Sequence, residues 1–254
     1  MANMEFLSAN IANTTTLFTT TAGGTGTLAN LVDRNVRLEW GSVGNTTDTS
    51  SLISIQFGTN TVISNLFLQN HNLRQYRIFF NSVTANTFTP DINISGASVT
   101  STYFLVTSVT VQSIQIQIDR SITDDTERSI GEWFAGFRQL QFTVNPSIEQ
   151  FNPVTSRTQV LHKMPDGGMI SYFVRDKFKA DLEFSFITDA FRNNLFNAFN
   201  NAQPLYFLEF PTTTAWDGAA REIIITSDFD FKYGTNQRAQ GWNGAMRIEE
   251  TPGV

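Results

Sequence analysis

Apolar and polar residues alternate with a period of two over much of this chain. Between Ser51 and Phe80 the alternation falls into three segments separated by Gly58-Thr59-Asn60 and by Asn70-His71-Asn72: Leu52–Phe57, Val62–Gln69 and Tyr76–Phe80. Such alternation, bounded by Gly and Asn, is typical of half-buried antiparallel strands. The pattern therefore predicts three short strands joined by turns, and a β scaffold around them.

Two later stretches repeat the pattern. In Val109–Ile118 the alternation predicts inward-facing side chains at Val111, Ile114, Ile116 and Ile118. Lys177–Ile187 is a second long strand candidate, whose predicted inward residues are Phe178, Ala180, Leu182, Phe184 and Phe186.

Only one segment has helical spacing. Thr188 is a preferred N-cap residue, and Asp189 in the first turn suits the helix dipole. Phe191, Leu195, Phe199 and Ala202 then form one apolar face, and Pro204 ends the segment. The pattern predicts a helix near residues 189–202.

The patterning changes between Pro146 and Pro153, which suggests a boundary near residue 145. We therefore expect a mainly β protein with two β-sandwich domains in tandem. Residues 1–145 would form a jelly roll, and residues 146–254 a β-sandwich with the one helix packed on it.

Composition limits the kinds of partner, metal site and membrane contact that this chain can have. The net charge of −6 disfavours nucleic acid, and the absence of cysteine excludes disulfides and thiolate chemistry. The two histidines, His71 and His162, are too few for a His-rich zinc site, although a mixed site with carboxylates stays open. The N-terminal stretch lacks the pattern of a secretory signal, and no run of 18 apolar residues predicts membrane insertion.

Motifs for catalysis are missing. Asp124, Asp125 and Glu127 cluster in a polar turn, as solvated loops do, and there is no Gly-x-Ser-x-Gly sequence. We therefore expect a protein that is not an enzyme. Low charge with abundant Thr, Asn and Phe is also typical of extracellular β-sandwich proteins and of virion components.

Residues 28–140 resemble the discoidin, or F5/8 type C, family of galactose-binding-like jelly rolls. The resemblance rests on the order and spacing of Leu31–Asn35, Trp40, Ile53–Gly58, Ile63–Leu68 with Tyr76–Ile78, and Ile130–Gly136. The Asn70-His71-Asn72 element is similar to a variant seen in phage tail proteins. The resemblance implies a jelly-roll fold.

The second unit resembles a tail-tube or distal-tail type domain. The strand Lys177–Ile187, the helix Asp189–Asn201 and the return strand Leu205–Phe210 carry this resemblance. Together the two resemblances imply a structural tail or baseplate protein of a bacteriophage. It would be located in the virion, be assembled in the host cytoplasm, and bind copies of itself and other tail proteins. The alternative is a stand-alone carbohydrate-binding module or adhesin that binds a cell-surface glycan.

The resemblance to discoidin domains also suggests a structural calcium ion, because that family often holds one in the loop containing Asn30, Asp33 and Asn35. Oxygen ligands suit Ca²⁺, and Glu132 is the one distant carboxylate that could complete the set. The competing interpretation is an ordinary turn, in which Asp and Asn bond their own backbone. No other cofactor is expected.

Candidate contact residues come from loops. His71, with Asn70 and Asn72, could donate hydrogen bonds to a sugar or to a neighbouring subunit, or could simply satisfy local carbonyls. Trp216 and Trp242 lie near glycines and are candidates for exposed contacts or interface anchors. Trp40 and Trp133 fit a buried core better.

Overall fold

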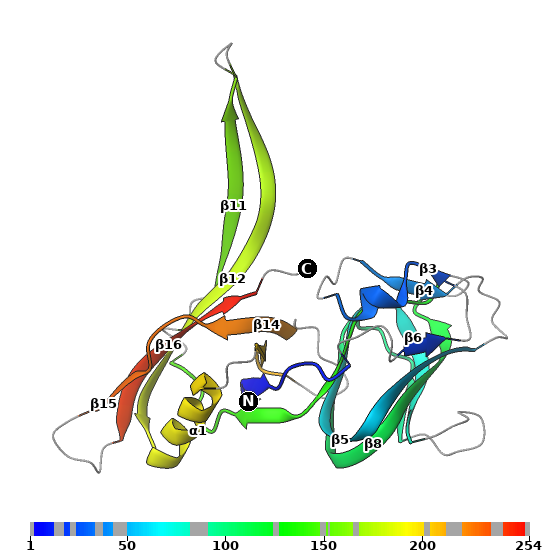
Figure 1. Ribbon diagram of the computed structural model, residues 1–254, viewed down its shortest axis with the longest axis horizontal. Helices are drawn as coiled ribbons and strands as arrows, with labels where there is room; N and C mark the ends of the chain where they lie inside the picture. Colours follow the sequence, from blue (N-terminus) through cyan, green and yellow to red (C-terminus); the bar gives the residue numbers. More distant parts are fainter. Residues whose placement is uncertain are drawn as a thin grey trace.

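The computed structural model describes residues 3–12, 18–20, 24–33, 38–42, 50–81, 91–123, 127–147, 151, 153–164, 168–200, 204–211, 220–234 and 241–251. Within these residues the protein is mainly β, with two eight-stranded sheets in sandwich-like units, a single α-helix and a short 3-10 helix (Figure 1). The predicted fold class is confirmed.

The first sheet has the order β3-β4-β9-β5-β8-β6-β7, with β2 paired to β5, and all its pairs are antiparallel. The 3-10 helix η2 (Leu28–Leu31) packs beside β9 and β4. The strands are β2 (Phe18–Thr20), β3 (Gly24–Thr25), β4 (Trp40–Ser42), β5 (Ser51–His71), β6 (Leu73–Phe80), β7 (Ile92–Ser95), β8 (Thr102–Ser121) and β9 (Ser129–Gly136).

Two long bent strands, β5 and β8, run through both layers of the first unit. Ser51–Gln56 of β5 pairs with the second half of β8, which in turn pairs with β6. Thr61–Leu68 pairs with the first half of β8, and Asn65–His71 pairs with β9. Between these halves, residues 57–60 of β5 stand opposite Gln112 alone, so the ladder contains a large, irregular bulge. Bulges bend strands, and bent strands form the corners of sandwiches.

This bulge corrects the prediction for Ser51–Phe80. The stretch forms two strands rather than three, because Gly58-Thr59-Asn60 lies inside β5 and does not reverse the chain. The core between the two layers is as predicted, since Val111, Ile114, Ile116 and Ile118 are fully buried. Trp40 and Trp133 are also buried in this core, as expected.

The second sheet has the order β10-β1-β13-β14-β16-β12-β11, with β15 paired to β16. Its single helix, α1 (Asp189–Asn200), packs on the core of this sheet. The strands are β1 (Glu5–Leu7), β10 (Arg138–Gln141), β11 (Val154–Lys163), β12 (Met169–Ile187), β13 (Leu205–Leu208), β14 (Ala220–Ile225), β15 (Asp230–Tyr233) and β16 (Trp242–Glu250).

The start of α1 confirms the helix prediction. The backbone N–H of Phe191 donates to the Thr188 hydroxyl at 3.2 Å, and Phe191, Leu195 and Ala198 are buried. In β12 the alternation holds from Phe178 to Phe184 but fails at Phe186, which is 63% exposed and has a φ of 57°. The register shifts there, and Ile187 becomes the next buried residue.

The segments before and after the strands of the first sheet both belong to the second sheet. β1 and β10 belong to the second sheet, so sheet membership changes between Gly136 and Arg138 and not at residue 145. The division into domains at residue 145 stays a prediction. The units are joined by a separate apolar cluster of residues from both sheets: Leu7, Phe67, Tyr103, Phe134, Tyr206 and Leu208.

A two-stranded hairpin projects from the second sheet. β11 and the first half of β12 pair from Val154↔Lys179 to Lys163↔Met169, and the ribbon stands away from the rest of the molecule (Figure 1). β11 is an edge strand of its sheet, with no further strand paired beyond it in the described residues. The same residues contain no helix long and apolar enough to cross a membrane.

Candidate functional site

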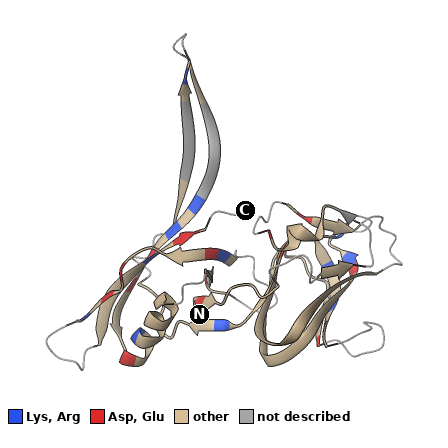
Figure 2. Ribbon diagram, in the orientation of Figure 1, with Lys and Arg blue, Asp and Glu red and all other residues tan. Residues whose placement is uncertain are grey.

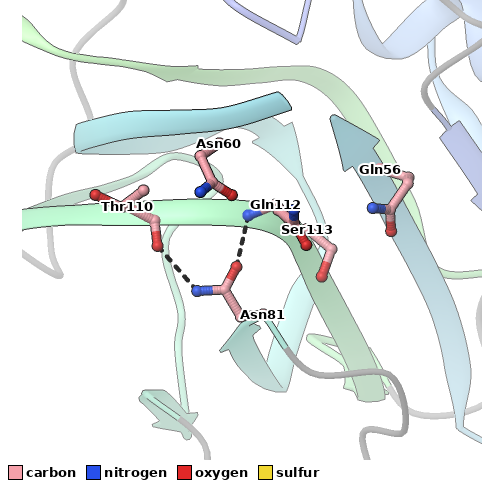
Figure 3. A pocket seen from close by; sticks show the side chains of 6 residues that line it. All are labelled: Gln56, Asn60, Asn81, Thr110, Gln112 and Ser113. Carbon is pink, nitrogen blue, oxygen red and sulfur yellow. Dashed lines mark hydrogen bonds between the residues drawn. The ribbon is translucent and has the colours of Figure 1, made fainter. Parts of the chain in front are cut away.

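The bulge between β5 and β8 opens a polar pocket of about 460 Å³ on the first unit. Figure 3 shows its lining, which comes from three segments that are far apart in the sequence. The lining residues are Gln56, Asn60, Asn81, Thr110, Gln112 and Ser113. All six carry an amide or a hydroxyl group, and none is charged or aromatic.

Asn81 lines this pocket and bonds to β8 at the bulge. It follows β6 with a φ of 59°, and its backbone N–H donates to the Ser113 carbonyl at 2.9 Å. Its side-chain amide donates to the Thr110 carbonyl at 2.9 Å and accepts from the Gln112 N–H at 2.5 Å. Asn81 thus supplies partners to β8 where the strand ladder is interrupted, and its side chain is occupied by this task.

Gln56, Asn60 and Gln112 are the other exposed side-chain amides of the lining. Each side-chain amide offers an acceptor oxygen and a two-hydrogen donor. Neighbouring hydroxyls of a sugar need the same pairing of donor and acceptor. The pocket can therefore bind an uncharged polyhydroxylated molecule, and its lining offers no cation to a phosphate or carboxylate.

His71 lies inside the first unit and not on a contact loop. Its side chain is 1% exposed, Nδ1 accepts from the Leu73 N–H at 3.2 Å, and Nε2 lies 2.8 Å from the Thr102 hydroxyl. Burial lowers the pKa of His71 to about 4. A side chain this enclosed cannot reach a sugar or a second subunit, which argues against the predicted contact role and favours the local one.

Asn70 and Asn72 hold the connection from β5 to β6. The Asn70 amide donates to the Glu39 carboxylate at 2.8 Å, and its φ of 51° lets the chain leave β5. The Asn72 amide oxygen accepts from the Ser129 N–H at 2.7 Å, and its nitrogen donates to the Glu127 carbonyl. These bonds give both asparagines a structural task.

The predicted calcium loop is only partly described. Asn30 lies in η2, where its amide oxygen accepts from the Thr27 hydroxyl and its nitrogen donates to the Glu39 carbonyl. These bonds give the Asn30 side chain a structural role, linking η2 to the residue before β4. Asp33 follows η2, Glu132 is buried in β9, and Asn35 lies outside the described residues. The described residues contain no group of three or more His, Cys, Asp or Glu side chains that could hold a metal.

Trp242 belongs to an aromatic cluster of the second unit, where β15 and β16 lie beside α1. Its indole N–H donates to the Asp189 carboxylate at 2.6 Å, and Tyr233 stacks on it with ring centroids 3.8 Å apart. The Arg192 guanidinium lies 4.4 Å from the Trp242 ring centroid. The second tryptophan predicted as a contact, Trp216, lies outside the described residues, as do Asp124 and Asp125.

The residues that line the pocket are not among those that the sequence predicts as contacts. Gln56 and Gln112 are the polar members of alternating strands, and Asn60 lies in a segment whose composition predicts a turn. Nothing in the sequence shows that these residues meet, because the bulge that brings them together depends on the pairing of β5 with β8.

No model of a known protein family matches this sequence, and no curated protein matches it either. Solved carbohydrate-binding modules are similar to about half of the chain. Chitosan-binding module 1 of a Paenibacillus sp. IK-5 chitosanase/glucanase is 13% identical, with a TM-score of 0.42 over 50% of this chain and 97% of that module. A fucose-binding module of Streptococcus pneumoniae is also 13% identical, with a TM-score of 0.40 over 51% of this chain and 95% of the module.

Identities and TM-scores at this level do not carry a function from one protein to another. The resemblance of the second unit to tail-tube or distal-tail domains stays a prediction.

Proposed function

We propose that this chain is a non-enzymatic binding protein that holds a neutral glycan in the polar pocket of its first unit. The observation that carries the proposal is the pocket lining, which consists entirely of amide and hydroxyl side chains. The volume of about 460 Å³ is within the range of roughly 300–1,000 Å³ that is usual for small-ligand sites.

The lining also predicts the strength of binding. No aromatic ring lines the pocket, so a sugar would be held by hydrogen bonds without stacking. Each such bond contributes about 0.5–1.5 kcal/mol net. A few of them give a dissociation constant in about the millimolar range. Weak binding of this kind becomes useful when many copies act together.

A glycan array with the labelled full chain tests this proposal. We expect binding to neutral oligosaccharides in preference to acidic ones. Gln112→Ala and Asn60→Ala should each weaken the binding about five- to tenfold, the effect of losing one hydrogen bond. Asn93→Ala is the matched control, because Asn93 is an exposed amide on β7 and does not line the pocket. Equal binding by all three variants would contradict the proposal.

A second candidate function is a structural component of a particle, as in a bacteriophage tail or baseplate. The observation that favours it is the projecting hairpin of β11 and β12, because a two-stranded ribbon with little support is marginally stable in water and gains stability from a neighbour. Mass spectrometry of purified virions and electron microscopy of the expressed chain test this function. A chain that is absent from particles and monomeric at high concentration would not fit it.

A further inference from the structure

The hairpin of β11 and β12 ends in apolar side chains that face solvent. Met164, Met169 and Ile170 are exposed, Met169 by 71%. Their neighbours His162 and Lys163 are exposed as well, and the ladder pairs Lys163 with Met169 and His162 with Ile170. We call these five residues the hairpin tip. Exposed methionines beside a cation are suited to a protein contact, since the thioether packs well against aromatic rings.

The hairpin differs in charge from the rest of the chain. Residues 154–180 contain five Lys or Arg and two Asp or Glu, a net charge of +3, whereas the whole chain has a net charge of −6. The remaining residues therefore carry −9. Figure 2 shows Lys or Arg at the tip and at the base of the hairpin, and both signs of charge over the body. Lys177 and Lys179, at the base of the hairpin, already pair with Glu249 of the same chain. Among the described side chains, Lys163 is therefore the cation at the tip that can attract the acidic body of another copy.

At the end of the second unit that is opposite the hairpin tip, aromatic side chains are exposed to solvent. Phe196 of α1 and Tyr233 of β15 are 39% and 41% exposed, and Arg192 lies within 6 Å of the rings of Phe196, Phe229 and Trp242. We call these five residues the aromatic face. Because Tyr233 stacks on Trp242, which also lies beside Arg192, the five side chains form one continuous cluster.

Acidic side chains border the aromatic face. Asp189, Asp228 and Asp230 are all exposed beside it. Asp189 binds the Trp242 indole, and Asp230 pairs at 2.9 Å with Lys232, whose side chain is 79% exposed. Clusters of Trp, Tyr and Arg are the composition that dominates binding energy at protein interfaces.

We propose that the hairpin tip of one copy docks on the aromatic face of a second copy. In a single chain the tip and the α1–β15 end lie at opposite extremes of the second unit, so they cannot meet (Figure 1). The methionines would contact the rings of Phe196 and Tyr233, and Lys163 would approach the bordering aspartates. The contact joins two different surfaces, so repetition builds a ring or a filament. The inference is independent of the glycan pocket.

Disulfide trapping tests the contact directly, because the natural chain has no cysteine. Met169→Cys and Lys232→Cys chains are mixed and oxidised gently. We expect cross-linked dimers in the mixture and few in either variant alone. Met169→Cys mixed with Asn93→Cys is the control, since Asn93 is exposed on the first unit. Equal cross-linking in the two mixtures would overturn the proposal, as would a dominant tip-to-tip link in Met169→Cys alone.

Sedimentation of the full chain supplies a second, independent readout. We expect reversible association that weakens with added salt, and at least tenfold weaker association for Met169→Lys. Leu105→Lys, which changes an exposed apolar residue of the first unit, should associate like the natural chain. Because both sites are exposed, neither variant should fail to fold. Association that Met169→Lys leaves unchanged would overturn the proposal, as would a natural chain that stays monomeric.

The particle function can be judged separately from this contact. If the chain occurs in virions and forms rings in electron micrographs while the cross-link fails, the particle function holds and this contact is wrong. If both fail, the second candidate function fails with the contact.

Discussion

At the scale of single residues, His71 shows how burial decides what a side chain does. The Asn-His-Asn sequence suggests a contact loop, yet the imidazole is enclosed between Thr102 and the Leu73 backbone. Accepting at Nδ1 and donating from Nε2 requires the neutral ring. Protonation would destroy the bond to the Leu73 N–H and place a charge in the core, which is why burial lowers the pKa of His71 to about 4.

This pKa predicts a loss of stability in acid. Between pH 6.5, the ordinary pKa, and about pH 4, the unfolded chain binds a proton that the folded chain does not. The free energy of unfolding therefore falls as the pH drops through this window, by up to about 3 kcal/mol from His71, and the loss levels off below it. Urea unfolding of the natural chain and of His71→Gln across this range checks the prediction. Parallel pH profiles for the two chains would contradict it.

At the scale of elements, α1 is the segment that the sequence describes best. Its cap and the first part of its buried stripe follow from local chemistry. Phe191 and Leu195 are buried as predicted, whereas Ala198 is buried and Phe199 is half-buried. Ala202 and the predicted end of the helix lie outside the described residues. The Thr188 hydroxyl accepts from the Phe191 N–H, and no residue distant in sequence is needed for this bond.

Thr188→Ala should therefore lower the free energy of unfolding by about 1 kcal/mol, the usual effect of losing an N-cap. Thr188→Ser keeps the hydroxyl and should restore most of the stability. Thermal and urea unfolding of the three chains measure both effects. If the two variants were equally destabilised, the hydroxyl bond would not be what stabilises the start of the helix.

The strands were predicted less completely because their partners are distant. Alternation identified the buried isoleucines of β8, since one face of that strand is in the core. It could not identify β1, whose three residues find their partners at positions 138–141 and 206–208, nor β11, whose residues are mostly polar. Gly58-Thr59-Asn60 has the composition of a turn, and only the pairing with β8 makes it a bulge. The pocket depends on that bulge, so it was not predictable either.

At the scale of the whole molecule, a buried carboxylate helps to join the two units. Glu5 of the second sheet is 3% exposed and accepts from the Tyr103 hydroxyl of the first sheet at 2.7 Å. Arg138 and Gln141 donate to its other oxygen at 3.3 and 3.1 Å. Tyr103 also belongs to the apolar cluster between the two sheets. The hydrogen bond to Glu5 and the packing of this cluster therefore both hold one unit against the other.

Tyr103→Phe should weaken this junction by about 1.5–3 kcal/mol, because it removes a hydrogen bond to a buried charged group. Urea unfolding measures the change. Tyr233→Phe is the control, since that ring is exposed and surface substitutions usually change stability by less than about 0.5 kcal/mol. Equal stability of the two variants would show that the Glu5 network does not strengthen the junction.

The central claim is that the pocket between β5 and β8 binds a neutral glycan. Nuclear magnetic resonance of the isotope-labelled chain tests it most directly, with titration of the neutral oligosaccharide that binds best on the array. We predict saturable shifts of the side-chain amide signals of Gln56, Asn60 and Gln112, while Asn93 stays unchanged. Shifts confined to residues outside the pocket, or no shift at millimolar sugar, would contradict the claim.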